Sequence, residues 1–373
     1  MKMTPVAKPF IGTEEIRAVT RVLKSGMLSL GPVHREFEVA FAKEIGTNYA
    51  VSVSSGTAGL HLAMIAAGVG AGDEVITSPF SFVASANSIL YVGAKPVFVD
   101  VDPETYNMDP QLVEKKITTR TKAILVVHIF GQSADMDPIL KLARRHRLKV
   151  IEDACESVNA TYKRKKVGTF GESAVFAFYP NKQMTTGEGG MLVTNSKRVA
   201  ELSRSLANQG RGDDLQWLDH VRLGYNYRMD ELSAAVGLVQ LKKIDFLIRA
   251  RQQIVAWYDH ALAPSPRLVK TPSIARGNTH TYFVYVVQLL GKRVKRDQVI
   301  AELKKIGVAT KPYLPSIPLL SFYRNRFGFR RGDFPISEHV SDRALALPLY
   351  IGLTQREVRG ICKKLLSILT PSV

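Results

Sequence analysis

The sequence predicts an α/β protein in which helices cover a mostly parallel sheet, followed by a smaller α+β region. The 373 residues are 46% hydrophobic and 23% charged, which is ordinary for a globular chain long enough to bury a sizeable core. Short, nearly continuous apolar runs alternate with helical patterns from about residue 47, as expected for strands that are buried on both faces. Near residue 245 this pattern changes, and we expect the chain to leave its first domain there.

The expected elements follow one another with short connections. A helix is expected over residues 13–25, with Thr13 as its N-cap, acidic residues in its first turn and Gly26 after its end. The apolar runs that we expect to be strands are 48–54, 74–78, 95–101, 122–131 and 149–154, and the expected helices between them are 57–68, 82–93, 110–117 and 137–147. Two more apolar runs, 173–180 and 190–195, have few residues between them, which favours an antiparallel pair.

The residue pattern in the second half of the chain predicts the smaller domain. Helical patterns dominate from about 196 to 263, and residues 262–280, rich in Pro, Ser and Gly, are the expected connection. Further elements are expected at 281–291, 296–306, 308–313 and 353–368. We therefore divide the chain into an N-terminal arm and helix that packs on the small domain (1–30), a large domain (31–245) and a small C-terminal α+β domain (246–373).

The chain is strongly basic, with 51 basic and 33 acidic residues and a net charge of +18. Such an excess suits nucleic acid, an anionic surface or anionic small ligands. The basic residues cluster at 141–149, 162–166 and 292–296, where each cluster reads as a polar helix face or an exposed turn, without zinc-finger spacing or a ribonucleoprotein motif. We interpret them as solvated faces together with an anionic small substrate, and a polyanion partner is the alternative.

The cysteines and the apolar runs indicate the compartment. Cys155 and Cys362 are far apart and lack metal-ligand spacing, so we expect neither a disulfide framework nor a metal site, and a reducing, cytoplasmic location. The N-terminal segment lacks the apolar stretch of a signal peptide, and no apolar run is long enough for a membrane span.

The segment Ser54-Ser55-Gly56-Thr57 joins an expected strand to an expected helix. The free N–H groups and the dipole at a helix N-terminus bind anions such as phosphate. Gly56 allows close backbone approach and the Thr57 hydroxyl adds a donor. The alternative is an ordinary capped helix, because Ser and Thr are common caps.

Two charged residues stand where other apolar runs end. Asp153 closes a buried strand, where a carboxylate either caps the next turn or serves as counter-ion to a buried cationic ring nitrogen. Lys182 lies in the Gly-rich turn after 173–180; alone it would be an exposed charge, but in a closed site desolvation disfavours the ammonium, and the neutral amine attacks carbonyls. Phosphate turn, aromatic residue, strand-end Asp and turn Lys, in that order, are the groups that pyridoxal 5′-phosphate (PLP) requires.

The chain resembles the nucleotide-sugar aminotransferases of the DegT/StrS type, which are fold-type-I PLP enzymes. The resemblance is carried, in order, by "SSGTAGLHLA", "SPFSFVASANSI", "VIEDACES", "FAFYPNKQMTTGEGG" and "LGYNYRMDELSAA", and extends over nearly the whole chain. It implies a large PLP-binding domain with a mostly parallel seven-stranded sheet covered by helices, and a smaller α+β C-terminal domain.

The resemblance also implies site residues. Lys182 would bind the cofactor aldehyde and later carry the proton between substrate and cofactor, and Asp153 would pair with the ring nitrogen. Phe82 would stack on the ring, where the alternative is core packing. Gly56, Thr57 and Ala58 would hold the phosphate. Asn226 would reach the phosphate of the neighbouring subunit, because the family places its site at a homodimer interface.

Three positions depart from the family pattern. Ala177 stands where a phosphate-binding Ser is frequent, and Pro318 stands where many members have His near the sugar. Glu156 occupies the place of a Gln or His near the ring hydroxyl. An ionised Glu156 would repel that oxygen, so we expect Glu156 to bind the cofactor in protonated form or to turn away.

The resemblance predicts transfer of an amino group from glutamate to a keto group of a nucleotide-linked (deoxy)sugar, in polysaccharide, O-antigen or secondary-metabolite biosynthesis. Relatives that are dehydratases have His in place of the lysine, so Lys182 favours transamination. A sugar dehydratase, a PLP-binding regulator without turnover, an inosose acceptor and a nucleic-acid-binding protein remain the alternatives, and we expect no specific nucleic-acid partner.

Overall fold

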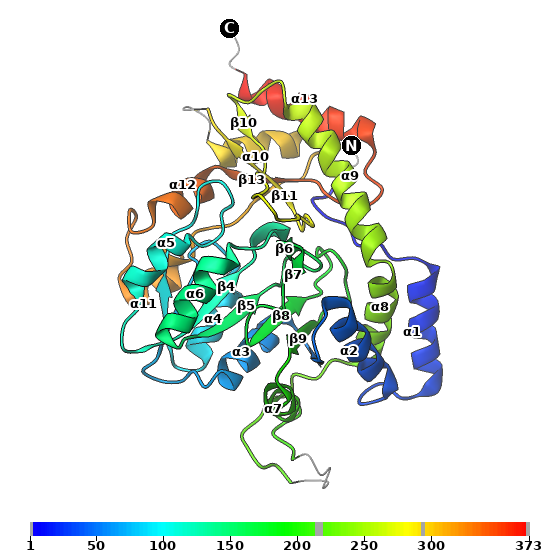
Figure 1. The fold of residues 1–373 in the computed structure, drawn as a ribbon. Coiled ribbons are helices and arrows are strands. Elements are labelled where there is room, and N and C mark those ends of the chain that lie inside the picture. The colour runs from blue at the N-terminus through cyan, green and yellow to red at the C-terminus, as the bar shows by residue number, and fades with distance from the viewer. Residues whose placement is uncertain (1–2, 213–218, 292–294, 371–373) are drawn as a thin grey trace.

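The computed structural model describes residues 3–212, 219–291 and 295–370, and its core is one large sheet (Figure 1). Seven strands form this sheet in the order β1-β9-β8-β5-β4-β2-β3. Their bounds are β1 Tyr49–Val53, β2 Glu74–Thr77, β3 Lys95–Phe98, β4 Thr121–Val127, β5 Lys149–Asp153, β8 Ser173–Ala177 and β9 Gly190–Thr194. Strand β9 runs antiparallel to both β1 and β8, and the other neighbours pair in parallel. The predicted fold class and the antiparallel last pair are therefore confirmed.

Helices cover both faces of this sheet, as the strand patterns predict. Successive side chains of a strand point to opposite faces, and in β8 Phe176 packs with Phe41 of α2 while Val175 packs with Leu60 of α3. Both faces are thus buried, which explains why the apolar runs are nearly continuous rather than alternating. The helices of this domain are α2 Pro32–Ile45, α3 Gly56–Ala66, α4 Ala84–Tyr91, α5 Pro110–Val113, α6 Met136–His146, α7 Lys197–Ala207 and α8 Glu231–Lys242.

The second domain is built on a four-stranded antiparallel sheet with the order β10-β11-β13-β12. Helix α9 (Ile244–Leu262) continues from α8 and rises from the large domain into the small one (Figure 1). Its apolar face packs on β11 and α13 around Tyr258 and Tyr285. The elements are β10 Val269–Lys270, β11 Tyr285–Leu289, β12 Lys311–Pro312, β13 Ala344–Leu347, α10 Arg296–Lys305, α11 Ser321–Phe327, α12 Pro335–Arg343 and α13 Gln355–Leu369. A short hairpin of β6 (Thr161–Tyr162) and β7 (Lys165–Lys166) lies outside both sheets.

The N-terminal segment contacts two parts of the molecule. The N–H of Thr4 donates to the carbonyl of Gly307 at 2.9 Å, so the arm pairs with the small domain. Helix α1 (Thr13–Ser25) instead packs on α8, because its buried Ala18 and Val22 meet Ala235. The expectation that this helix packs on the small domain is therefore wrong, whereas the domain boundaries themselves stay predictions.

The start of α1 also differs from the expectation. Gly12 is the N-cap, and Thr13 is the first helical residue. The side chain of Glu15 accepts the N–H of Gly12 at 2.8 Å, so the acidic residue of the first turn closes this helix end. A threonine cap is not needed when a carboxylate reaches back to the preceding backbone N–H.

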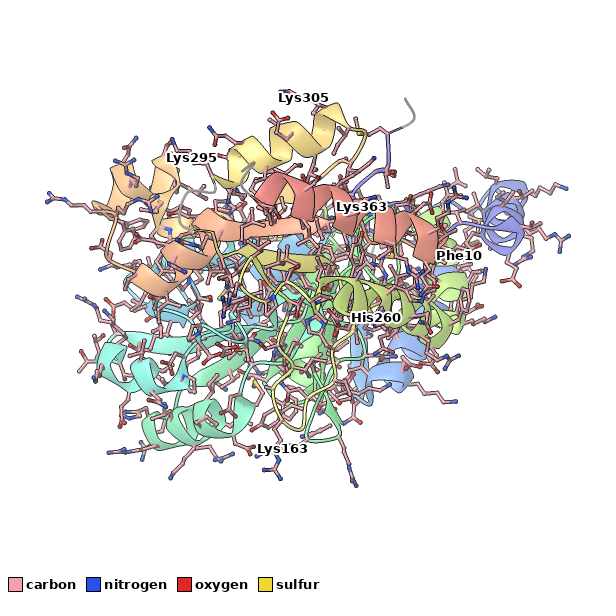
Figure 2. The ribbon with its side chains drawn as sticks, turned by 90° about the horizontal axis from the view of Figure 1, so that it is seen from above. Phe10, Lys163, His260, Lys295, Lys305 and Lys363 are labelled. Atoms are coloured by element: carbon pink, nitrogen blue, oxygen red, sulfur yellow. The ribbon has the colours of Figure 1, made fainter. Side chains whose placement is uncertain are left out.

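The basic residues are spread over the molecule. Lys163, in the β6–β7 hairpin, and Lys305, at the end of α10, project from opposite sides of the view in Figure 2. Lys163 pairs with Asp137 and Lys305 with Glu302, as on ordinary solvated faces. Residues 292–294 of the third basic cluster lie outside the described residues. Among the helices of the described ranges, none is both long and apolar enough to cross a bilayer.

Candidate active site

The ends of the parallel strands bring the sequence-predicted residues to one edge of the large sheet. Because β1, β5 and β8 run in the same direction, the segments that follow them lie at the same edge. These segments carry Gly56 and Thr57 after β1, Asp153 and Glu156 at the end of β5, and Lys182 after β8. Residues that are 125 positions apart in the chain, Thr57 and Lys182, thus belong to one region.

Cys155 shows how closely the first two segments approach. Its N–H donates to Oδ1 of Asp153 at 3.2 Å, and its Sγ would lie 2.9 Å from a Cβ added at Gly56. Burial raises the pKa of the Cys155 thiol, with the charge of Asp153 adding to the rise and that of Lys182 opposing it. Cys155 therefore lies between Asp153 and Gly56 and connects their two segments.

The start of α3 has an N-cap residue and also N–H groups that can bind a ligand. Ser55 is the N-cap, and its Oγ accepts the N–H of Ala58 at 3.1 Å. The first N–H groups of a helix have no acceptor within the helix, so those of Gly56 and Thr57 are available to an anion. A side chain at Gly56 would also collide with Ala177, at 2.7 Å between Cβ atoms, which explains the glycine and the small residue facing it.

Asp153 is a buried carboxylate, 5% exposed. Ser85 donates its hydroxyl to Oδ2 at 2.6 Å, and Ser81 lies 2.7 Å from that hydroxyl. Among the described residues no lysine, arginine or histidine forms an ion pair with Asp153. A buried carboxylate without a cation is costly, and this one therefore suits a ligand that carries positive charge.

Lys182 does not point to bulk water, because only 12% of its side chain is exposed. Its Nζ lies 3.6 Å from Oε1 of Glu156 and 3.9 Å from the centre of the Phe283 ring. A cation over an aromatic face is attracted by the ring quadrupole. Phe283 comes from the small domain, so both domains form the surroundings of this amine.

Glu156 is buried beside Lys182. The N–H of Phe130 donates to its Oε2 at 2.9 Å. Burial raises the pKa of Glu156 above its ordinary value, although Lys182 and the Phe130 N–H oppose the rise. The expectation of a protonated Glu156 agrees with this direction, and the side chain faces Lys182 instead of turning away.

Phe82 and Asn226 are exposed, unlike the other candidates. Phe82 lies just before α4 with 61% of its surface exposed, so core packing does not account for it. Asn226 is exposed on the segment between α7 and α8, and its two neighbours in sequence, Tyr225 and Tyr227, stack their rings on each other. Pro318, by contrast, is buried in a short 3₁₀ turn.

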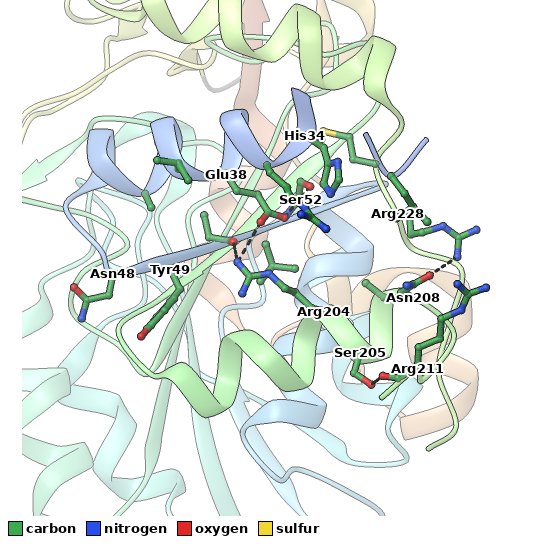
Figure 3. A pocket seen from close by; sticks show the side chains of 18 of the residues that line it. His34, Glu38, Asn48, Tyr49, Ser52, Arg204, Ser205, Asn208, Arg211 and Arg228 are labelled. Atoms are coloured by element: carbon green, nitrogen blue, oxygen red, sulfur yellow. Dashed lines mark hydrogen bonds and ion pairs between the residues drawn. The ribbon is translucent and has the colours of Figure 1, made fainter. Parts of the chain in front are cut away.

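A cavity of about 530 Å³ holds none of the predicted site residues (Figure 3). It lies between α2, β1 and α7, where Arg204 pairs with Glu38 at 3.2 Å. A cavity of about 400 Å³ borders the lysine turn instead, with walls that include Asn181, Phe283 and Tyr313.

Sequence reasoning missed three residues that contact the lysine turn, namely Phe283, Tyr313 and Arg251. Each lies in or near the small domain, about 70 to 130 positions away in the chain, so no local spacing connects them to the lysine. An arginine at a buried position of an amphipathic helix was the available signal for Arg251. The segment "TYFVYVV" offered only a strand pattern for Phe283.

Comparison with known proteins agrees with this arrangement. A model of the DegT/DnrJ/EryC1/StrS aminotransferase family matches residues 9–366. The chain belongs to this family. The resemblance seen in the sequence is thereby confirmed, and so is the enzyme class: this family member is an aminotransferase.

Individual relatives of this aminotransferase cover nearly its whole length. GDP-perosamine synthase of Caulobacter vibrioides is 42% identical over 342 residues, 91% of this chain and 91% of that protein. Spore coat polysaccharide biosynthesis protein SpsC of Bacillus subtilis is 40% identical over 369 residues, 96% of this chain and 95% of that protein. Spr1654 of Streptococcus pneumoniae, solved in a PLP form, superposes with a TM-score of 0.92 at 28% identity, covering 99% of this chain and 100% of that one.

Proposed function

We propose that this aminotransferase uses PLP to move an amino group from glutamate to a keto group of a nucleotide-linked sugar. The observation that carries the proposal is the meeting of a shielded lysine, a buried unpaired carboxylate and a helix N-terminus at one edge of the sheet. The PLP form of Spr1654 supports the cofactor.

The residues present fit this cofactor. Asp153 is buried without an ion-pair partner among the described residues, as a protonated ring nitrogen requires. The N–H groups of Gly56 and Thr57 and the Thr57 hydroxyl would take the phosphate, with Ala58 next to them in the first turn. The exposed ring of Phe82 is free to stack on a planar ligand.

Each side chain then has a distinct task. Bound PLP supplies an electrophilic carbonyl carbon and an electron-withdrawing ring. With the cofactor bound, Nζ of Lys182 would accept the proton of the substrate carbon and give it back in the same half-reaction, a kind of help that contributes about two to four orders of magnitude in rate. Asp153 would pair with the ring nitrogen and favour its protonated form. Burial raises the pKa of Glu156, which favours the protonated acid, and in that form Glu156 would donate to the ring oxygen instead of repelling it.

The acceptor class rests on the relatives. The name of GDP-perosamine synthase refers to a nucleotide-linked sugar, and the name of SpsC refers to polysaccharide biosynthesis. The net charge of +18 favours approach of a substrate that carries a pyrophosphate, because opposite charge steers association. We extend the proposal to a cytoplasmic location, supported by two free cysteines.

We also propose a homodimer with shared sites. Asn226 is exposed on its own subunit, which suits a role at the neighbour's phosphate. The neighbouring surface includes exposed apolar side chains in the segment before α2, Met27, Leu28 and Leu30. Covering such side chains is typical of an oligomer interface.

The test is a screen of nucleotide keto-sugars against the pyridoxamine-loaded enzyme. We expect one of them to restore the spectrum of the aldehyde-loaded form, and glutamate to regenerate the amine form with release of 2-oxoglutarate. Lys182→Ala should lose both half-reactions, whereas Lys43→Ala, at an exposed position of α2, should keep them. Turnover by Lys182→Ala at the wild-type rate would contradict the proposal.

A further inference from the structure

Arg251 is a buried cation without an acidic partner. It lies on α9 and is only 5% exposed. No aspartate or glutamate of the described ranges forms an ion pair with it. Burial lowers the pKa of Arg251 to about 10, so the guanidinium is still charged at neutral pH. Arginines are almost never this buried unless they are paired. A charged arginine at this position therefore needs a structural or functional explanation.

Within the described part of the chain, the guanidinium donates to backbone carbonyls. Nη2 donates to the carbonyl of Lys182 at 2.8 Å. Nη1 donates to the carbonyls of Phe283 at 3.3 Å and Tyr282 at 3.4 Å. One planar group thus joins the lysine turn of the large domain to the segment that enters β11 of the small domain.

The two joined segments carry the two partners of one contact. Nζ of Lys182 lies 3.9 Å from the ring centre of Phe283, and Arg251 holds the backbone of both residues. Gln183 adds a second tie, since its Nε2 donates to Oγ1 of Thr281 at 3.0 Å and also to the carbonyl of Glu156. The lysine turn is therefore tied to the Phe283 segment through Arg251 of α9 and to Glu156 through Gln183.

The geometry suits arginine in particular. A guanidinium offers five N–H donors in a rigid planar fork, whereas the lysine ammonium is a compact point charge on a flexible stem. A lysine at this position would reach one of the two segments but would not span both in a fixed geometry. A methionine would keep the packing volume and would leave three buried carbonyls without their donors, a costly change.

We propose that Arg251 is a positioning residue, which fixes the turn of Lys182 against the small domain so that the amine is held where its partner carbonyl carbon binds. The amine's task rests on the proposed function. The positioning itself does not, because the three hydrogen bonds belong to this chain alone.

The first test needs no cofactor. Hydrogen exchange, followed by mass spectrometry, is measured on the PLP-free wild type and on Arg251→Met, Arg251→Lys and the control Arg249→Met, whose exposed arginine lies on the same helix. We expect peptides covering 179–186 and 281–284 to exchange about tenfold faster in Arg251→Met, while peptides elsewhere and the control keep wild-type rates. Arg251→Lys should restore part of the protection.

The second test follows the amine. Borohydride trapping of added PLP on Lys182 should be about tenfold slower in Arg251→Met and intermediate in Arg251→Lys, because misplaced reacting groups lose rate steeply. In turnover, kcat should fall while KM for the amino acceptor stays near that of the wild type.

The outcomes separate the two proposals. Wild-type exchange in both segments, or wild-type trapping in Arg251→Met, overturns the positioning role. If Arg251→Met does not fold, Arg251→Lys decides: full wild-type exchange and trapping in that variant show that the fork is not needed and overturn the inference. Failure of the wild type to trap PLP would refute the proposed function, and the exchange result would still decide the role of Arg251.

Discussion

Replacing Asp153 by Asn separates folding from cofactor binding at one position. The carboxylate accepts the Ser85 hydroxyl at 2.6 Å and the Cys155 N–H at 3.2 Å. In Asp153→Asn the amide oxygen can accept the Cys155 N–H, while the amide nitrogen donates to Ser85 Oγ. Ser85 can then donate to Ser81, whose Oγ lies 2.7 Å away. The same number of hydrogen bonds survives the substitution.

Two opposite effects follow from this geometry. A hydrogen bond to a charged group contributes about 1.5–3 kcal/mol and a neutral one about 0.5–1.5 kcal/mol, so the PLP-free protein loses roughly 1 kcal/mol per bond. The substitution also removes a buried, unpaired charge, and with it a desolvation penalty on the order of several kcal/mol. We therefore expect the unfolding free energy of the PLP-free protein to stay unchanged or to rise. The charge-assisted bond to the ring nitrogen is lost outright, so PLP affinity should fall about 10- to 100-fold.

Urea unfolding of the PLP-free protein and a spectroscopic PLP titration measure the two effects. Asp100→Asn is the matched control: Asp100 is also buried and accepts the N–H groups of Ile336 and Ser337 at 2.9 Å, at the start of α12. It should lower stability and leave PLP affinity unchanged. The reasoning is refuted if Asp153→Asn binds PLP as tightly as the wild type, or if its PLP-free form is strongly destabilised.

Three other experiments test neighbouring features. Burial raises the pKa of Glu156 above its ordinary value of 4.5. Between the unfolded and folded pKa values the folded state binds more protons than the unfolded state, so wild-type stability should fall as pH rises through that range; Glu156→Gln should flatten this slope in urea titrations at several pH values. Gly56→Ala places its Cβ 2.7 Å from that of Ala177 and should cost about 1–3 kcal/mol by thermal unfolding, whereas Gly70→Ala meets no atom within 4 Å and should be neutral. Mixing inactive Lys182→Ala and Asn226→Ala chains should restore about one quarter of the wild-type activity, because half of randomly paired dimers are mixed and each has one complete site; no recovery would count against the shared site.

Much of the large domain was predictable from local pattern. Strands buried on both faces are apolar throughout, and the turns after them are polar, so both the strands and the segments carrying Gly56, Asp153 and Lys182 could be predicted. The first helical turn shows the limit of this reasoning. Thr13 and Gly12 are both acceptable caps, and the reach of the Glu15 side chain decided between them.

The sequence alone determined the α/β class, the strand-end placement of Asp153 and Lys182, and, through its similarity to a family, the class of chemistry. Only the tertiary structure decided that Phe283 and Arg251 stand around the lysine, that Glu156 faces it, and that Phe82 is exposed. The physical reason is one of range: backbone sterics and side-chain periodicity act over a few residues, whereas burial and the pairing of charges depend on segments that meet only after folding.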